Sequence, residues 1–337
     1  MERGLDWSLL GALFSEREER VRDAAALCAT PAGQGIITAS ISELVAPELF
    51  FHLQRFNALD LISADGQQLL QDTVLLNEFL HKDLSVVFQD VITVATSLGV
   101  KPTVLKGGID IVSPCDAINR SRVVGDLDLW LPGTQAEALF QGLVDRGFRI
   151  DDKSLARYGA REWHHHLHPL WHPEVNQYVE IHRALGPGKP FQQLTDCLSA
   201  NSVERSCATG QFYVPTLTMR LCHSVLHHRR DAALASNAHR SFRHTLDYVR
   251  MCRLLDDVDR AFLADNPAVM SNRGLRRALK WGEVVASTLD PENHPRHGGV
   301  GINEMYWLRI RAKWLSRALN LAAKGVKRLF QVLGRAS

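Results

Sequence analysis

The sequence predicts an α+β protein in which a small mixed sheet, with helices of its own, lies between two helical regions. Three observations predict this class. Apolar residues follow helical spacing near the start, short alternating segments broken by Gly and Pro occupy the middle, and helical spacing returns afterwards. We therefore expect an N-terminal helical region (1–100), an α/β core (101–190), a helical region packing on the core (191–304) and a basic amphipathic helix (305–337).

Three helical stretches are expected before the core. The stretches 6–29, 41–60 and 64–98 each place apolar residues at positions i, i+3, i+4 and i+7. The third has the broadest apolar stripe, which predicts a helix with one face buried. This region shows no pattern that is typical of a reactive site.

The core is expected to alternate strands and helices. Gly107-Gly108 forms a turn after the first strand, Pro132-Gly133 stops the second strand, and Thr134 caps the helix that follows. This spacing leaves room for four or five strands. The expected strands are 103–106, 125–131, 148–150, 163–171 and 178–182, and the expected helices are 107–112 and 135–146.

The last segment, 305–337, reads as a basic amphipathic helix. No acidic residue follows Glu304, and Lys and Arg alternate there with Trp, Leu, Val and Phe. The pattern is typical of a helix that docks on an anionic membrane surface or an acidic partner, here through 305–335. A terminal helix packed on the core, with its basic face in solvent, would show the same pattern.

The composition limits the classes of function. A hydrophobic content of 45% is enough for a sizeable core, and a formal net charge of +2 does not favour nucleic acid as a partner. The six cysteines include no CxxC pair, and the first residues do not resemble a signal peptide, which predicts reduced thiols. No apolar run approaches the ~20 residues of a membrane span. We therefore expect a cytoplasmic protein, peripheral to the membrane if the last helix docks there.

Two carboxylates one residue apart are the most informative feature of the core. Side chains at i and i+2 of a strand point to the same face, so Asp126 and Asp128 should project together while Leu127 and Leu129 are buried. Like charges this close repel each other, and a bound cation relieves the repulsion. Oxygen ligands favour Mg²⁺ over zinc. An exposed strand edge that carries charge for solubility is the plainer interpretation.

Phosphoryl or nucleotidyl transfer with two metal ions also needs a third carboxylate from a neighbouring strand. Glu180 is the best candidate, because it lies in an alternating segment and shares a face with His182. It would complete the metal site or accept a proton.

Phosphate oxygens need donors and positive charge near these carboxylates. Gly107 and Gly108 would let a triphosphate approach the backbone, and Lys106 and Arg122 would supply positive charge. Alternatively, the glycines form an ordinary turn, Lys106 is solvated and Arg122 only neutralises the acidic pair.

Three separated motifs occur in a familiar order. They are Lys106-Gly107, the segment from Arg122 to Leu129 that contains Gly-Asp-Leu-Asp-Leu, and Val-Glu-Ile-His at 179–182. Together they resemble the uncharacterised nucleotidyltransferase family of the DNA polymerase beta superfamily, over roughly 53–255. Two features depart from the superfamily pattern: the segment 109–125 is longer than in compact members, and the third acid is Glu where many relatives carry Asp.

The resemblance implies a small polymerase-beta-like mixed sheet and transfer of a nucleoside monophosphate from an NTP to a hydroxyl of an unknown acceptor, a small molecule or a protein. Asp126, Asp128 and Glu180 match the catalytic, metal-binding acids, which hold two Mg²⁺ ions, with Mn²⁺ as the alternative. Gly107 and Gly108 match the triphosphate-binding turn.

Two other functions stay open. One is a non-catalytic, NTP-binding regulatory protein on the same fold. The other is a zinc-dependent hydrolase, since imidazole is a good zinc ligand and several histidines gather in the sequence. These histidines are His164, His165, His166, His168, His172 and His182, with His223, His227 and His228 further on. Asp247 would contact the nucleotide or pack between regions.

Overall fold

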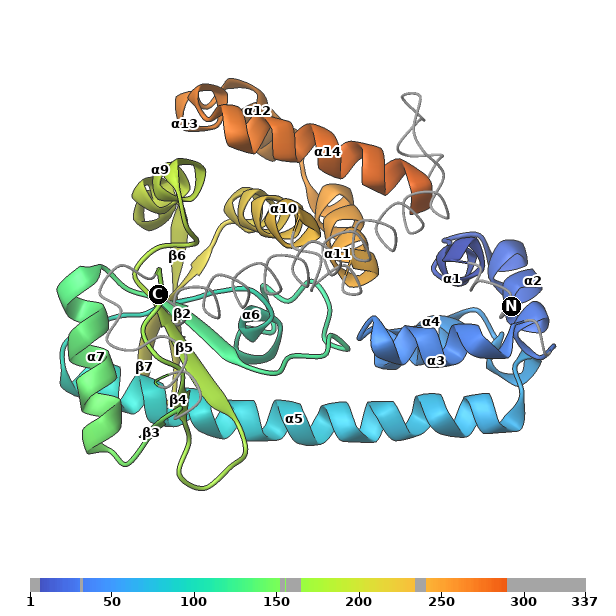
Figure 1. Cartoon of the computed structure of the whole chain (residues 1–337), viewed down its shortest axis with the longest axis horizontal. Helices are drawn as coiled ribbons and strands as arrows, with labels where there is room; N and C mark the ends of the chain where they lie inside the picture. Colours follow the sequence, from blue (N-terminus) through green and yellow to red (C-terminus); the bar gives the residue numbers. More distant parts are fainter. Residues whose placement is uncertain (1–6, 31–32, 152–154, 156–164, 234–240, 290–337) are drawn as a thin grey trace, which may run out of the picture.

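The computed structural model describes residues 7–30, 33–151, 155, 165–233 and 241–289 (Figure 1). His164, the first part of the expected strand 163–171, and the whole of the expected helix 305–337 lie outside the described residues. The docking of 305–335 therefore stays a prediction. None of the described helices combines the length and the apolar composition that crossing a lipid bilayer requires.

Within the described residues, seven strands form one mixed sheet in the order β3-β4-β5-β2-β1-β7-β6. β2 runs parallel to β5 and β1 parallel to β7, whereas the other neighbours are antiparallel. The strands are β1 (Thr103–Val104), β2 (Leu127–Trp130), β3 (Arg149–Ile150), β4 (Leu170–Trp171), β5 (Tyr178–His182), β6 (Ser202–Cys207) and β7 (Gly210–Pro215). The α+β prediction is confirmed.

Helices precede, interrupt and follow the sheet (Figure 1). Before it come α1 (Trp7–Leu13), α2 (Glu18–Cys28), α3 (Gln34–Ser42), α4 (Ala46–Arg55), the 3₁₀ turn η1 (Leu59–Leu61) and α5 (Ala64–Ser97). Between the strands lie α6 (Gly108–Val112), α7 (Gly133–Asp145), α9 (Lys189–Leu198) and the 3₁₀ turn η2 (Ser199–Asn201). After the sheet come α10 (Leu217–Ala233), α11 (Ser241–Leu254), α12 (Asp257–Asp265), α13 (Pro267–Ser271) and α14 (Arg273–Leu289).

The alternation along β2 gives the two faces of the sheet different neighbours. Leu127 and Leu129 pack in a hydrophobic core with α5 and α7. Trp130 packs in a second core with α9, α10 and α11, and Asp128 borders the cavity on that side. The polar side chains of the strand therefore face the C-terminal helices, which cover them.

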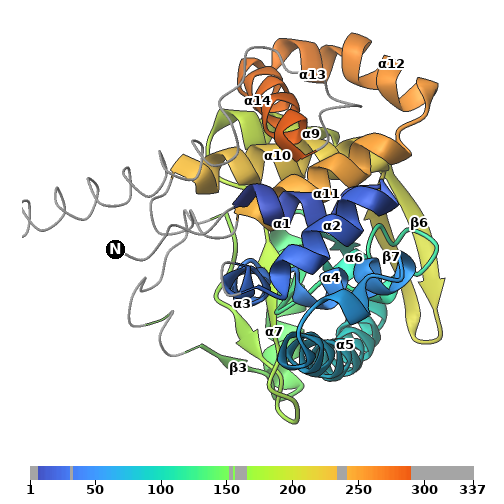
Figure 2. The same cartoon turned by 90° about the vertical axis from the view of Figure 1, so that its right-hand side faces the viewer.

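The long helix α5 joins the N-terminal helices to the sheet (Figure 1). Ser63 caps its start, where the Oγ accepts a hydrogen bond from the backbone N–H of Gly66 at 3.2 Å. Figure 2 shows α5 nearly end-on, beneath α4 and beside α7. The helix therefore supports both the N-terminal bundle and one face of the sheet.

Two strands appear that the sequence pattern did not predict. β6 and β7 form a hairpin that extends the sheet to Pro215, beyond the expected end of the core at residue 190. The prediction of four or five strands is therefore wrong. β6 lies at the sheet edge, where most of its side chains are at least partly in solvent and no apolar alternation is needed. β7 lies between β1 and β6 and buries Phe212 and Val214, an alternation too short to be recognised in the sequence.

Other differences are local. β2 begins at Leu127 rather than at residue 125, so Asp126 precedes the strand, and β1 ends before Lys106. β4 is limited to Leu170–Trp171. The residue that flanks α7 is Pro132, so Thr134 does not cap that helix. Strand and helix ends depend on pairing with neighbours, which local periodicity does not encode.

Candidate active site

The Gly107-Gly108 turn lies directly beside the carboxylate strand. It follows β1 and opens α6. Lys106 enters it with φ of 50°, a left-handed conformation that strains a residue with a side chain. Leu105 donates its backbone N–H to the carbonyl oxygen of Asp128 at 2.9 Å. The turn is thereby tied to β2.

Gly107 is held between two side chains of the loop that precedes β2. A Cβ at Gly107 would lie 2.8 Å from Val124 Cγ2 and 3.1 Å from Arg122 Nη1. α5 supports this loop from behind, since the carbonyl oxygen of Arg122 accepts a hydrogen bond from His81 Nε2 at 2.8 Å. The backbone can therefore pass close to the guanidinium only with glycine at this position.

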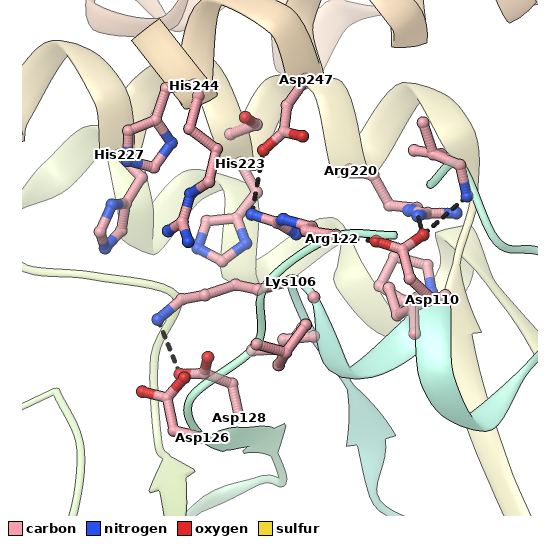
Figure 3. Close-up of a pocket in the computed structure, with 18 of the residues that line it drawn as sticks. Lys106, Asp110, Arg122, Asp126, Asp128, Arg220, His223, His227, His244 and Asp247 are labelled. Atoms are coloured by element: carbon pink, nitrogen blue, oxygen red, sulfur yellow. Dashed lines mark hydrogen bonds and ion pairs between the residues drawn. The ribbon is translucent and has the colours of Figure 1, made fainter. Parts of the chain in front are cut away.

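The three predicted carboxylates come together, two on neighbouring strands and one directly before the first of them. β2 and β5 are parallel, and Asp128 pairs in register with Glu180. Asp126 lies two residues before Asp128, and Figure 3 shows both carboxylates close together below Lys106. Two chain segments far apart in the sequence thus build one acidic site.

Asp128 is the centre of this site. Its Oδ1 accepts hydrogen bonds from Lys106 Nζ at 2.6 Å and from His182 Nε2 at 2.7 Å. His182 Nε2 also lies 3.6 Å from Glu180 Oε2. One potential ligand atom from each of Asp128, Glu180 and His182 lies within 4.8 Å of the others. The described residues therefore contain a buried Asp-Glu-His group that could hold a metal ion.

Two carboxyls of the site have raised pKa values, mainly because they are buried. Burial, reinforced by the charge of Asp128, raises the pKa of Asp126 to about 6. Burial and the same neighbour raise the pKa of Glu180 to about 8. Lys106 opposes both shifts without cancelling them. A bound cation would restore the ordinary ionisation of both groups.

Asp128 and His182 behave differently. Burial opposes the ionisation of Asp128, but Lys106 and His182 hold its pKa well below its usual range. Burial lowers the pKa of His182 to about 4 even though Asp128 is adjacent. At neutral pH, Asp128 is thus an anion, and a neutral imidazole donates its Nε2 hydrogen to it.

Arg122 lies on the other side of the turn, between two further carboxylates. Its Nη2 is 3.0 Å from Asp247 Oδ2 and its Nη1 is 3.8 Å from Asp110 Oδ2. Within the described parts of the chain, its ion pairs are with these acids and not with Asp126 or Asp128. Arg122 therefore does not simply neutralise the acidic pair, as one interpretation of the sequence suggested.

A cavity of about 360 Å³ connects these groups. The turn, Lys106, Asp126 and Asp128 line one side, and α10 and α11 form the opposite side with His223, His227 and His244 (Figure 3). A cavity of this size accommodates a small molecule. Burial lowers the pKa values of His223 and His244 well below the usual value, so both rings are neutral at neutral pH.

The other histidines take several roles. His172 Nε2 contacts Asp90 Oδ2 of α5 at 3.1 Å, on the far side of the sheet. His223 Nε2 donates to the carbonyl oxygen of Leu185 at 3.1 Å. The potential metal-ligating group found among the described residues includes His182 but none of the other histidines. The rings of His165 and His166 lie beside that of His182, with centroids 5.8 and 5.5 Å away, whereas His172 lies apart from them on Asp90.

Sequence reasoning missed several residues of the site. Asp110 lies inside the apolar helix α6, and a buried acid in such a segment is the signal that could have revealed it. Arg220, Arg243 and His244 line the cavity from α10 and α11, where only the tertiary structure brings them near the turn. His182 was noted on the face of Glu180 but was given no role at the carboxylates.

Comparison with known proteins agrees with this geometry. No curated protein and no solved structure matches the chain. One family model matches residues 34–280, and its description is "uncharacterised nucleotidyltransferase". The match includes the turn, all three carboxylates, Arg122 and Asp247. The chain therefore belongs to this family of uncharacterised nucleotidyltransferases.

Proposed function

We propose that the protein transfers a nucleoside monophosphate from an NTP to a hydroxyl of an acceptor, a small molecule or a protein. The observation that carries this proposal is the in-register pair Asp128 and Glu180, with Asp126 beside it and the Gly-Gly turn adjacent. Family membership supports nucleotidyl transfer in general.

The donor set of the site fits a divalent cation. Asp126, Asp128 and Glu180 supply oxygen ligands. Burial beside Asp128 raises the pKa values of Asp126 and Glu180, and a bound cation would favour the ionised form of both. Oxygen-rich sites favour Mg²⁺ or Mn²⁺, and the nearby imidazole of His182 is a better ligand for Mn²⁺ than for Mg²⁺. When bound, such cations neutralise phosphate charge and acidify an attacking hydroxyl. We propose Mg²⁺, in two sites, with Mn²⁺ as the alternative.

The turn and its basic neighbours suit the triphosphate. The backbone of Gly107 and Gly108 can approach closely because neither carries a side chain, and Lys106 and Arg122 flank the turn. Both side chains would donate hydrogen bonds to the β- and γ-phosphate oxygens. This places the α-phosphate nearer to Asp126 and Asp128.

The reaction then follows from the chemistry of the groups. The acceptor oxygen forms a bond with the α-phosphorus, the bond from that phosphorus to the α,β-bridging oxygen breaks, and pyrophosphate leaves with the electron pair. The hydroxyl proton passes to a base or to water. Glu180 is assigned to the metal site because its carboxylate lies within 4.8 Å of the ligand atoms of Asp128 and His182.

The proposal is tested with NTPs labelled at the α- or γ-phosphate. Wild type, Asp128→Asn and Asp90→Asn are incubated with Mg²⁺ and pools of small-molecule or protein acceptors. We expect the α-label, but not the γ-label, to reach an acceptor with wild type and Asp90→Asn. Asp90 is a matched control, since it is an ion-paired aspartate on the far side of the sheet.

The outcome separates this proposal from the two other functions. Binding of Mg²⁺-NTP without transfer of label in any pool would favour a non-catalytic NTP-binding regulatory protein. About one zinc per purified chain, with hydrolysis that a zinc chelator stops, would favour a zinc-dependent hydrolase. Transfer of the α-label by Asp128→Asn at the wild-type rate would overturn the site assignment.

A further inference from the structure

We propose that Asp247 is a positioning residue, which together with Asp110 holds the Arg122 guanidinium against the Gly107-Gly108 turn, where it meets the phosphates of the donor nucleotide. This inference rests on the proposed function. It gives a role to an aspartate of α11, more than a hundred residues after the turn in the sequence.

The contacts of the Arg122 guanidinium leave this side chain little conformational freedom. Its Nη2 lies 3.0 Å from Asp247 Oδ2, and its Nη1 lies 3.8 Å from Asp110 Oδ2. The side chains of Arg122 and Asp247 are only 14% and 10% exposed. On the side of the turn, Nη1 would lie 3.1 Å from a Cβ at Gly107. The guanidinium is thus held by acids and lies against the turn.

Asp110 and Asp247 have different roles. Asp110 Oδ1 also accepts hydrogen bonds from the backbone N–H groups of Ile118 and Asn119, at 2.6 and 3.2 Å, and it lies 3.5 Å from Arg220. Asp110 therefore organises the loop after α6 as well. The ion pair that Asp247 forms among the described residues is with Arg122. Asp247 is the acid whose removal tests the orientation of the guanidinium with the least effect elsewhere.

Arg122 is attracted by two groups of acids, so an acid beside the turn is needed to hold its guanidinium there. The charges of Asp247 and Asp110 act most strongly on it, and those of Asp128 and Asp126 also act. A guanidinium released from Asp247 would be drawn toward the catalytic carboxylates. There it would compete with the divalent cation and leave the turn. Asp247 thus keeps Arg122 at the phosphate position and the carboxylates available for metal.

The direction in which polyphosphate affinity changes in Asp247→Asn distinguishes a positioning role of Asp247 from a simple effect of its charge. Asp247→Asn removes a negative charge close to the proposed phosphate site, so charge alone predicts tighter binding of a polyphosphate. Positioning predicts weaker binding, because the neutral amide no longer holds the guanidinium. Because one charge-assisted hydrogen bond to phosphate is lost, we expect the affinity for polyphosphate to fall about tenfold.

The experiment is titration calorimetry with inorganic tripolyphosphate and with each NTP, at saturating Mg²⁺. We expect about tenfold weaker binding of tripolyphosphate by Asp247→Asn and by Arg122→Gln. The double variant should bind no more weakly than Arg122→Gln alone, because Asp247 acts through Arg122. Asp90→Asn, which breaks a matched Asp–Arg contact at 2.8 Å, should bind as wild type does.

A second variant covers the case in which Asp247→Asn does not fold. Arg122→Lys keeps the charge but lacks the planar fork that contacts two acids and a phosphate at once, so we expect it also to bind tripolyphosphate about tenfold more weakly. Circular dichroism and thermal unfolding of every variant identify loss of folding.

Each result decides the inference. Unchanged or tighter binding by folded Asp247→Asn, additive losses in the double variant, or wild-type binding by Arg122→Lys would overturn it. A folded wild type that binds neither tripolyphosphate nor any NTP would instead overturn the proposed function. Failure of the inference and failure of the proposed function are therefore distinguishable.

Discussion

Two acidic clusters lie on either side of the Gly-Gly turn, and their charges are balanced differently. On the sheet side, the ammonium of Lys106 acts on Asp126, Asp128 and Glu180, and the charges of Arg243 and Arg122 add a weaker effect on Asp126. On the helix side, Asp110 and Asp247 surround Arg122, and Asp110 also meets Arg220. Among the described residues, one ammonium forms an ion pair with an acid of the sheet side, Asp128, whereas two guanidiniums form ion pairs with the two acids of the helix side.

The neighbours of a buried carboxyl show which cluster needs a further cation. Burial raises the pKa of Asp110 as well as that of Glu180. For Asp110 the strongest charge effects, those of Arg122 and Arg220, oppose the rise, whereas for Glu180 the strongest, that of Asp128, adds to it. A buried acid surrounded by arginines is typical of a positioning contact, and one surrounded by acids is typical of a cation site.

The largest expected effect comes from removing the central acid of the sheet-side cluster. Asp128→Asn should weaken Mn²⁺ binding by at least about a hundredfold, since even outer-shell changes cost up to that much. Asp247→Asn, in the other cluster, removes no metal ligand and acts only through competition from the released Arg122 guanidinium, so it should weaken Mn²⁺ binding far less. Titration calorimetry measures both. Equal losses in the two variants would contradict the distinction between the clusters.

The pH dependence of metal binding should follow the raised pKa values. Glu180 must lose its proton to bind a cation, so Mn²⁺ affinity should rise with pH, roughly tenfold per unit, and level off above about 8. Calorimetry at several pH values measures this. Glu180→Gln should bind more weakly and lose that dependence near pH 8. A pH-independent affinity in wild type would show that Glu180 is not a ligand.

The raised pKa of Glu180 also predicts how the stability of the metal-free protein changes with pH. Because the pKa of Glu180 lies above its usual value of 4.5 in the folded state, its contribution to stability is lost as pH rises from about 4.5 to about 8. Stabilisation by Mn²⁺ in a thermal melt should therefore be larger at pH 8 than at pH 6. Glu180→Gln is the control, since it cannot ionise.

Removing the ammonium of the sheet-side cluster should act in opposite directions on two ligands. Lys106 Nζ lies 2.6 Å from Asp128 Oδ1 and competes with a cation for that carboxylate. Lys106→Met should thus bind Mn²⁺ about tenfold more tightly in the absence of nucleotide and bind tripolyphosphate more weakly. Weaker binding of both ligands would show that Lys106 supports the metal site rather than competing for it.

The smallest effect is expected at an ion pair outside both clusters. Glu137 and Arg183 lie 3.2 Å apart, with the Glu137 side chain 56% exposed. Glu137→Gln should change the free energy of unfolding by less than about 1 kcal/mol and leave Mn²⁺ binding unchanged. Chemical denaturation measures the first and calorimetry the second. A large loss of metal binding would mean that the site depends on charges beyond the two clusters.

Much of the fold was predictable because it rests on local patterns. Helix α5 and strand β5 match the expected ranges closely, since a long apolar stripe and a clear alternation are properties of neighbouring residues. The edge strand β6 was not predicted because one flank and most of its side chains face solvent. Its pairing with β7, rather than its composition, makes it a strand.

For the site, the sequence by itself determined which side chains are candidates for the chemistry. The spacing of Asp126 and Asp128, the alternation around Glu180 and the Gly-Gly turn after Lys106 can be recognised in a few residues each. Such patterns show which groups share a face or a turn, because backbone geometry repeats every two residues in a strand and every few in a helix. They identify candidate site residues without their partners.

The tertiary structure alone decided the partners. It placed Glu180 in register with Asp128, gave Asp128 its hydrogen bond from His182, and brought Asp247 to Arg122. These contacts join residues far apart in the sequence, and their formation depends on how whole helices and strands pack against each other. Periodicity within one segment carries no information about a partner in another, so the charge balance of each cluster becomes visible only in the folded molecule.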